Sequence, residues 1–120
     1  MQALIVDDST AMRSVLRLLL RQAGFVVSEA GNGREALALL HSTGPFDLAL
    51  FDWNMPEMNG IELLTEVRGN HAYDAMPVMM VTTETEITEM QKALTVGANE
   101  YMMKPFSKDA VFEKLRLLGF

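Results

Sequence analysis

The sequence predicts an α/β fold, a doubly wound five-stranded parallel sheet with five helices. Short apolar runs alternate along the chain with longer segments whose apolar residues recur at helical spacing. The short runs are nearly continuous in apolar residues, which is typical of parallel strands covered by helices on both faces. The 120 residues, 49% of them hydrophobic, have the size and composition of one domain with a substantial core.

The first half of the chain is expected to supply three strands and two helices. The strands are expected at residues 3–6, 25–30 and 48–51. Gly24 ends the first helix, whose inward-facing residues are expected to be Met12, Val15, Leu16, Leu19 and Ala23. Asn32 can cap a second helix, which Gly44 and Pro45 close and whose inward-facing residues are expected to be Ala36, Leu37 and Leu40.

The second half is expected to supply two strands and three helices. Residues 53–60 contain Asn, Pro and Gly, so they are expected to form a loop. The strands are expected at residues 78–81 and 100–103. Gly97 ends the fourth helix and Ser107 can cap the fifth. The inward-facing residues of the three helices are expected to be Ile61, Leu64 and Val67, then Ile87, Met90 and Leu94, then Val111, Leu115 and Leu118.

Composition and charge exclude several function classes. The formal net charge of −6 disfavours binding to nucleic-acid backbones and to anionic membrane surfaces. The chain has no cysteine, which excludes disulfides, thiol chemistry and cysteine-ligated metal sites. No apolar run is long enough to span a membrane, and the N-terminus lacks the basic start of a signal peptide. We therefore expect a cytoplasmic protein with a single domain over residues 1–120, no membrane insertion and no direct nucleic-acid contact.

Polar residues follow most of the expected strands at their carboxyl ends. Asp7 and Asp8 follow the first strand, and the third, fourth and fifth strands lead to Asp52, Thr82 and Lys104. The carboxyl ends of parallel strands lie at one edge of the sheet, and ligands bind there in this fold class. We therefore expect these side chains to meet in one crevice.

Three carboxylates in one crevice require positive charge nearby. At about 4 Å and an effective dielectric constant of about 20, each pair repels by roughly 4 kcal/mol. Mg²⁺ suits carboxylate ligands, Lys104 adds a fixed cation, and Thr82 adds a hydroxyl donor. These groups are the parts needed to hold a phosphoryl group. Asp52 is the best nucleophile candidate because it follows a central strand, whereas Asp7 and Asp8 are better placed to hold the metal.

The motifs that carry a family resemblance are Asp7-Asp8, Asp52-Trp53-Asn54-Met55-Pro56 with Gly60, Met80-Val81-Thr82 and Lys104-Pro105-Phe106. Over the whole chain they resemble the response-regulator receiver family, and most of all its stand-alone chemotaxis regulators. The resemblance implies a flavodoxin-like sheet with the strand order 2-1-3-4-5 and a cis peptide bond before Pro105. It also implies a two-component phosphorelay, in which a sensor histidine kinase is the phosphodonor.

The resemblance assigns the phosphoacceptor and the metal ligands. Asp52 would accept the phosphoryl group, and Asp8, Asp52 and the backbone carbonyl of Asn54 would bind Mg²⁺. Asp7 would hold a metal-bound water. The complete set implies a protein that promotes its own phosphorylation, and not an enzyme that turns over another substrate.

The resemblance also assigns the residues that couple phosphorylation to partner binding. Thr82 would hydrogen-bond a phosphoryl oxygen, Lys104 would pair with the phosphoryl group, and Tyr101 would turn inward as Thr82 moves. The output surface would then be the face formed by the fourth helix, the fifth strand and the fifth helix.

Three further positions are expected to affect how long the phosphoryl group persists and how fast small phosphodonors react. Asn54 and Glu84 fall where the family guides or blocks water, which implies self-catalysed dephosphorylation. Thr83 stands where many relatives carry a smaller residue, so its bulk is expected to slow small phosphodonors. Residues 84–90 are acidic where motor-binding relatives carry lysines. The output partner, a flagellar motor switch or a kinase, therefore stays open.

Other function classes are compatible with the same fold. An aspartyl phosphatase or phosphotransferase would carry its Asp-x-Asp motif after the first strand, whereas here Asn54 stands two residues after the expected acceptor. A phosphorylation-independent interaction module would not need the full set of acids with Thr82 and Lys104. A phosphate sink or a relay intermediate would use the same phosphoacceptor.

Several residues have two interpretations. Tyr101 is either the aromatic switch or a half-buried packing residue, and Trp53 is either at the rim of the site or a packing residue. Most of the ten methionines are expected in the core. His41 and His71 are expected on the surface. Either a solvated helix face or a partner-selecting surface is expected at Glu84, Glu86 and Glu89.

Overall fold

The computed structural model describes residues 1–83 and 87–120, and its five parallel strands form one sheet in the order β2-β1-β3-β4-β5. The strands are β1 (Gln2–Val6), β2 (Val26–Ala30), β3 (Leu48–Asp52), β4 (Val78–Thr82) and β5 (Glu100–Met103). The helices are α1 (Thr10–Gln22), α2 (Gly33–Thr43), α3 (Gly60–Arg68), α4 (Ile87–Val96) and α5 (Lys108–Leu117), with a short 3-10 helix, η1 (His71–Tyr73). The predicted fold class and strand order are confirmed.

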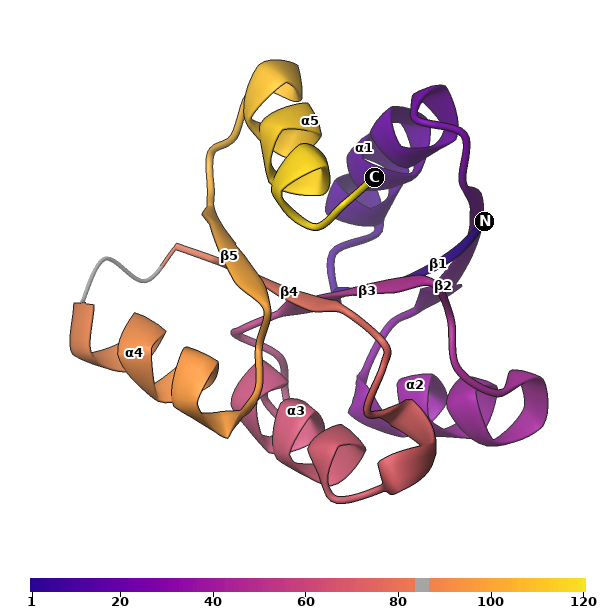
Figure 1. The fold of residues 1–120 in the computed structure, drawn as a ribbon, viewed down its shortest axis with the longest axis vertical. Helices are drawn as coiled ribbons and strands as arrows, with labels where there is room; N and C mark the ends of the chain where they lie inside the picture. Colours follow the sequence, from indigo (N-terminus) through magenta and orange to yellow (C-terminus); the bar gives the residue numbers. More distant parts are fainter. Residues whose placement is uncertain (84–86) are drawn as a thin grey trace.

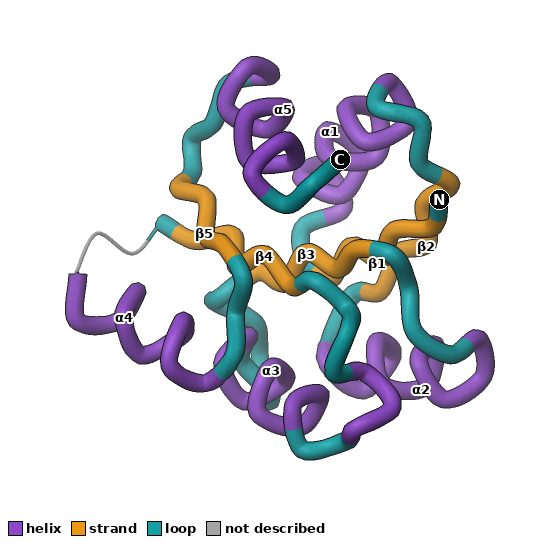
Figure 2. Tube along the Cα trace, in the orientation of Figure 1, coloured by secondary structure: helices purple, strands orange, loops and turns teal. Residues whose placement is uncertain are grey.

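Helices cover both faces of the sheet. Figure 1 shows α1 and α5 on one face and α2, α3 and α4 on the other, and Figure 2 shows the strands as the layer between them. Successive strand residues alternate between the two apolar clusters: Ala3 and Ile5 pack toward α1 and α5, whereas Leu4 and Val6 pack toward α2 and α3. Every residue of β3 and β4 is buried. The central strands therefore form a rigid base for the residues at their ends.

Two predicted helix faces are wrong at single positions. Val15 and Leu94, predicted to face inward, are 48% and 43% exposed. The buried residues of α1 are Leu16 and Leu20, which lie one turn apart, and Val15 lies beside this line because each residue rotates the helix by about 100°. On α4, Ala93 is buried in place of Leu94. The side chain of Ile87 lies outside the described part of the chain.

Polar side chains fix where the helices begin. Asn32 and Ser107 cap α2 and α5 as predicted, and each accepts a backbone N–H of its helix, at 2.9 and 3.1 Å. β2 begins at Val26 and not at the predicted residue 25. The reason is that the Phe25 N–H donates to the Leu20 carbonyl at 3.0 Å, which continues the end of α1.

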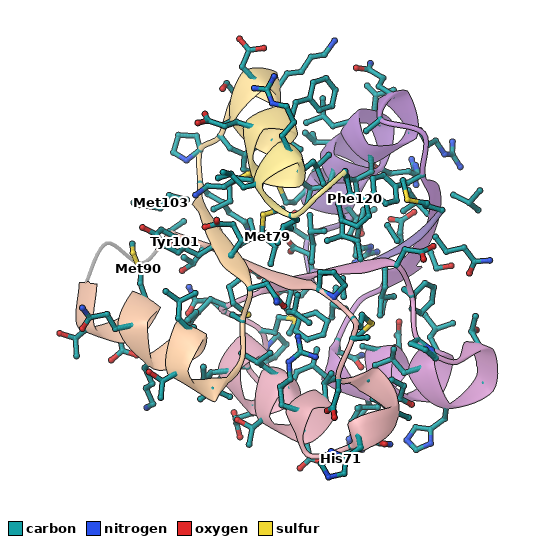
Figure 3. The ribbon with its side chains drawn as sticks, viewed as in Figure 1. His71, Met79, Met90, Tyr101, Met103 and Phe120 are labelled. Atoms are coloured by element: carbon teal, nitrogen blue, oxygen red, sulfur yellow. The ribbon has the colours of Figure 1, made fainter. Side chains whose placement is uncertain are left out.

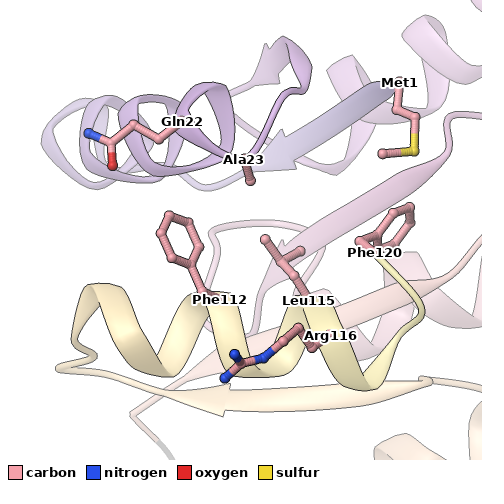
Figure 4. A pocket seen from close by; sticks show the side chains of 7 residues that line it. All are labelled: Met1, Gln22, Ala23, Phe112, Leu115, Arg116 and Phe120. Atoms are coloured by element: carbon pink, nitrogen blue, oxygen red, sulfur yellow. The ribbon is translucent and has the colours of Figure 1, made fainter.

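A cavity of about 220 Å³ lies where the end of α1 faces α5, lined by Ala23, Phe112 and Leu115 among others (Figure 4). Met1, at the amino end of β1, also lines it, so the cavity lies at the opposite edge of the sheet from the strand-end acids. Its volume is below the roughly 300 Å³ at which ligand pockets begin. Of the helices in the described residues, none is both long and apolar enough to cross a membrane.

Candidate functional site

The sheet brings the predicted site residues to one edge. Asp52 and Thr82 are the last residues of β3 and β4, Asp7 and Asp8 follow β1, and Lys104 follows β5. These four strands are consecutive neighbours in the sheet, so their carboxyl ends lie next to each other. The strand ends that carry the predicted site residues therefore lie side by side.

The three aspartates form an acidic cluster. Carboxylate oxygens of Asp7, Asp8 and Asp52 all lie within 4.8 Å of one another. Asp7 and Asp52 are buried, at 1% and 5% exposure, and Asp8 is exposed. An all-oxygen set with one side open to solvent suits a hard divalent cation that keeps some of its waters. The donor set therefore fits a metal ion, as the sequence predicts.

Lys104 supplies the fixed positive charge. Its Nζ donates to Asp7 Oδ2 and to Asp52 Oδ1, each at 3.1 Å, and its side chain is 16% exposed. The Lys104 backbone N–H donates to the Thr82 carbonyl at 2.7 Å, and the predicted cis bond to Pro105 is present. The lysine thus bridges the two buried carboxylates and leaves Asp8 outside the bridge.

Burial and charge shift the pKa of Asp52 and of Lys104. Burial is the largest influence on Asp52 and raises the pKa of its carboxyl; Lys104 lowers the pKa, while Asp7 and Asp8 raise it, and the net shift is upward. Burial is also the largest single influence on Lys104 and lowers its pKa, but the hydrogen bonds to Asp52 and Asp7 and the charges of these two carboxylates together outweigh burial, so the net shift is upward. Lys104 therefore stays protonated, whereas the charged form of the Asp52 carboxyl is disfavoured in the folded protein.

Asp52→Asn is expected to stabilise the metal-free protein at neutral pH. Because folding raises the pKa of Asp52, the destabilisation by its charge is absent below the unfolded-state pKa, sets in as pH rises through the folded-state pKa, and persists at neutral pH. Urea unfolding in a chelator, at neutral pH and at acidic pH, measures the effect. A variant less stable than wild type at neutral pH would contradict this electrostatic account.

Gly60 allows the start of α3 to pack directly against the end of β3. The Gly60 N–H donates to the Trp53 carbonyl at 2.9 Å, and the Trp53 N–H donates to the Val81 carbonyl at 2.9 Å. A Cβ at position 60 would overlap the Asp52 carbonyl oxygen and lie 2.8 Å from Met80 Cε. The backbone of Asp52 is thus fixed by a contact that only glycine permits.

Gly60→Ala is expected to destabilise the fold by about 1–3 kcal/mol, because the overlapping atom belongs to the backbone and cannot move aside alone. Gly69→Ala, at the other end of α3, is the matched control, since a Cβ there would lie 3.4 Å from its nearest atoms. Urea unfolding of both variants measures the difference. Equal stability of the two would show that the contact at Asp52 is not tight.

Comparison with known families agrees with this geometry. The family model described as the response regulator receiver domain matches residues 3–116. The chain is a member of the response regulator receiver family.

Relatives of this receiver domain carry chemotaxis names. The chain is 44% identical to "Chemotaxis protein CheY" of Pseudomonas aeruginosa over 116 residues, which cover 96% of this chain and 93% of that protein. It is 41% identical to "Chemotaxis protein CheY-3" of Vibrio cholerae over 116 residues, covering 96% and 88%. The solved structure of Vibrio cholerae CheY4 superposes with a TM-score of 0.88 at 37% identity, over 96% of this chain and 95% of that one.

The other residues predicted to take part in the site are Asn54, Thr83, Glu84 and Tyr101. Asn54 and Thr83 are exposed beside the strand ends, whereas Glu84 lies outside the described residues. Tyr101 is partly buried on β5, the last strand of the sheet (Figure 3), with Lys114 Nζ 4.9 Å from its ring centroid. This partial burial is compatible with both interpretations of Tyr101.

Trp53 and most of the methionines are packing residues in this receiver domain. Trp53 is 9% exposed and belongs to the apolar cluster on the α2, α3 and α4 face. The methionines in the core are Met55, Met76, Met79, Met80, Met90 and Met102. His41 and His71 are exposed, as predicted.

Arg13 is a site residue that sequence reasoning missed. Its Nη1 donates to the backbone carbonyl of Asp7, and its Nε pairs with Glu29 Oε1 at 3.3 Å. The signal available in the sequence was weak, because an arginine in the first turn of a helix is usually a solvated surface residue. Arg13 on α1 and Glu29 on β2 come together beside Asp7 only in the folded chain.

Proposed function

We propose that this receiver domain is a phosphorylation switch in a two-component system and that Asp52 is its phosphoacceptor. The observation that carries the proposal is the position of the Asp52 carboxylate, which is buried at the end of a central strand, bonded to Lys104 and clustered with Asp7 and Asp8. The donor would be a phosphohistidine on a sensor histidine kinase.

In the proposed transfer, an Asp52 carboxylate oxygen attacks phosphorus and the phosphorus–nitrogen bond of the phosphohistidine breaks. The imidazole nitrogen keeps the bond's electron pair, and the aspartyl phosphate is the product. Lys104, already within hydrogen-bond distance of Asp52, would pair with phosphoryl oxygens. Mg²⁺, held by Asp8, Asp52 and the Asn54 backbone carbonyl, with Asp7 holding a metal-bound water, would neutralise charge on the phosphoryl group.

The proposed output is a change at the face formed by α4, β5 and α5. Thr82, buried at the end of β4, would donate its hydroxyl to a phosphoryl oxygen. Tyr101 on β5 would follow it inward. A coupling free energy of about 1–3 kcal/mol between the site and this face is enough for a useful switch.

The proposed activity is self-modification and not turnover of an external substrate. Asn54, exposed two residues after Asp52, supplies no second acid to protonate a leaving group. Loss of the phosphoryl group would proceed by water attack on the aspartyl phosphate, with Asn54 and Glu84 tuning access.

The chemotaxis names of the relatives favour a chemotaxis-type pathway in the cytoplasm, with a protein as the output target. A flagellar motor switch and a kinase are both candidates. The three glutamates in residues 84–90 stand where the family resemblance implies lysines in motor-binding members, and this favours a partner other than the motor. A role as a phosphate sink or relay would use the same acceptor.

The proposal is tested by intact mass after incubation with Mg²⁺ and acetyl phosphate or phosphoramidate, with a chelator in a parallel sample. One added phosphoryl group in the Mg²⁺ sample alone is the expected result. Because Thr83 is expected to slow small donors, Thr83→Ala is run beside the wild type. No phosphoryl gain in either protein, together with no stabilisation by Mg²⁺, would favour a phosphorylation-independent interaction module.

A further inference from the structure

We infer that Arg13 is a positioning residue for the metal site: its guanidinium fixes the peptide unit between Asp7 and Asp8 and thereby sets the position of the Asp8 carboxylate. The inference rests on the proposed function, because it concerns the binding of Mg²⁺ at the acidic cluster.

Asp8 is the member of the cluster whose side chain is held least. Asp7 and Asp52 are buried and both bind Lys104, and Asp7 Oδ1 also accepts the Ser9 N–H at 2.9 Å. Asp8 is exposed, and within residues 1–83 and 87–120 no hydrogen bond or ion pair holds its carboxylate. Its position relative to Asp52 is therefore determined by its backbone.

Arg13 controls that backbone. The carbonyl of Asp7 and the N–H of Asp8 belong to one planar peptide unit. Arg13 Nη1 donates to this carbonyl, while the Asp7 N–H on the other side of the residue donates to Ala30 at 3.1 Å. The peptide unit between Asp7 and Asp8 thus accepts a hydrogen bond from a charged guanidinium, and such charge-assisted hydrogen bonds are strong.

Glu29 holds the Arg13 guanidinium in the required orientation. Arg13 Nε pairs with Glu29 Oε1 at 3.3 Å, and Arg17 Nη1 pairs with the other oxygen of the same carboxylate at 2.6 Å. The Arg13 side chain is 18% exposed. Arg13 and Arg17 therefore share an acidic partner, but of the two only Arg13 donates to the Asp7 carbonyl.

A positioning role for Arg13 and a purely electrostatic role predict opposite changes in Mg²⁺ affinity when Arg13 is replaced by alanine. A guanidinium near the cluster repels a divalent cation, so if charge alone mattered, Arg13→Ala would tighten Mg²⁺ binding and Arg13→Lys would leave it unchanged. If Arg13 positions Asp8, both substitutions weaken binding, because lysine keeps the charge but lacks the planar fork that spans the Asp7 carbonyl and Glu29.

The test is the Mg²⁺ dissociation constant of Arg13→Ala, Arg13→Lys and Arg17→Ala, measured by fluorescence of Trp53, the single tryptophan, which directly follows Asp52. Both Arg13 variants are expected to bind Mg²⁺ about tenfold more weakly, which is typical for residues that orient metal ligands. Arg17→Ala is expected to stay within about twofold of wild type because it changes charge without touching the Asp7 carbonyl. Wild-type affinity in Arg13→Lys, or tighter binding in Arg13→Ala, would overturn the inference.

Wild type and Asp8→Ala in the same titration separate this inference from the proposed function. If the wild type binds Mg²⁺, Asp8→Ala does not, and the Arg13 variants match the wild type, then only the positioning role fails. If the wild type shows no saturable binding, the metal site and the positioning role fail together. A cooperative thermal transition of each variant without Mg²⁺ shows that weakened binding does not result from unfolding.

Discussion

Asp52→Asn is expected to take up no phosphoryl group from acetyl phosphate, phosphoramidate or a phosphorylated histidine kinase. The asparagine amide has no nucleophilic carboxylate oxygen, which the transfer requires. The side chain keeps its size and its place at the end of β3. Intact mass at increasing times measures the loss, which should be complete within the detection limit. Partner binding that depends on a phosphodonor is expected to disappear with it.

Asp74→Asn is the matched control for this variant. It makes the same chemical change at an aspartate whose side chain is 57% exposed and pairs only with the exposed His71 among the described residues. It should be phosphorylated as fast as the wild type. Phosphorylation of Asp52→Asn at the wild-type rate would remove Asp52 from the proposed role.

Asp8→Ala is expected to abolish stabilisation by Mg²⁺. A ligand that binds only the folded state stabilises it by roughly 2.7 kcal/mol at 100 times its dissociation constant, so the wild type should melt at a distinctly higher temperature in excess Mg²⁺. Removal of the exposed carboxylate takes one oxygen ligand from the cluster and also relieves repulsion in the metal-free protein. The melting temperature of the variant should therefore be insensitive to Mg²⁺.

Thermal melts over a Mg²⁺ titration, with Asp74→Ala as the control, measure this difference. Asp74→Ala should retain the full response, because its carboxylate lies outside the acidic cluster. An Asp8→Ala protein that is still stabilised by Mg²⁺ as strongly as the wild type would place the cation elsewhere.

The sheet and most of the site edge were predictable from sequence because buried parallel strands are continuous apolar runs with polar residues at their ends. Asp52, Thr82 and Lys104 each stand directly at such an end, and the rule that ligands bind at the carboxyl ends of parallel strands predicts that the three side chains meet. The inward-facing residues of the helices were harder to predict, as the exposed side chains of Val15 and Leu94 show. A side chain at the margin of an apolar stripe is buried or exposed depending on how the helix is rolled on the sheet.

The contacts that support the site were not predictable in the same way. The overlap that a Cβ at Gly60 would make with the Asp52 carbonyl depends on how closely α3 approaches β3. The Arg13 contact with the Asp7 carbonyl depends on Glu29, which lies on a different element. Both are distances between elements, and local periodicity contains no information about them.

The most direct test of the central claim is to locate the modified residue. The protein is phosphorylated with phosphoramidate and Mg²⁺, the acyl phosphate is reduced with borohydride, and the peptide that carries the resulting homoserine is sequenced by mass spectrometry. We predict homoserine at position 52 alone, and none when Mg²⁺ is removed before phosphorylation. Homoserine at position 7 or 8, or none at all in a protein that has gained phosphoryl mass, would contradict the assignment of Asp52 as the phosphoacceptor.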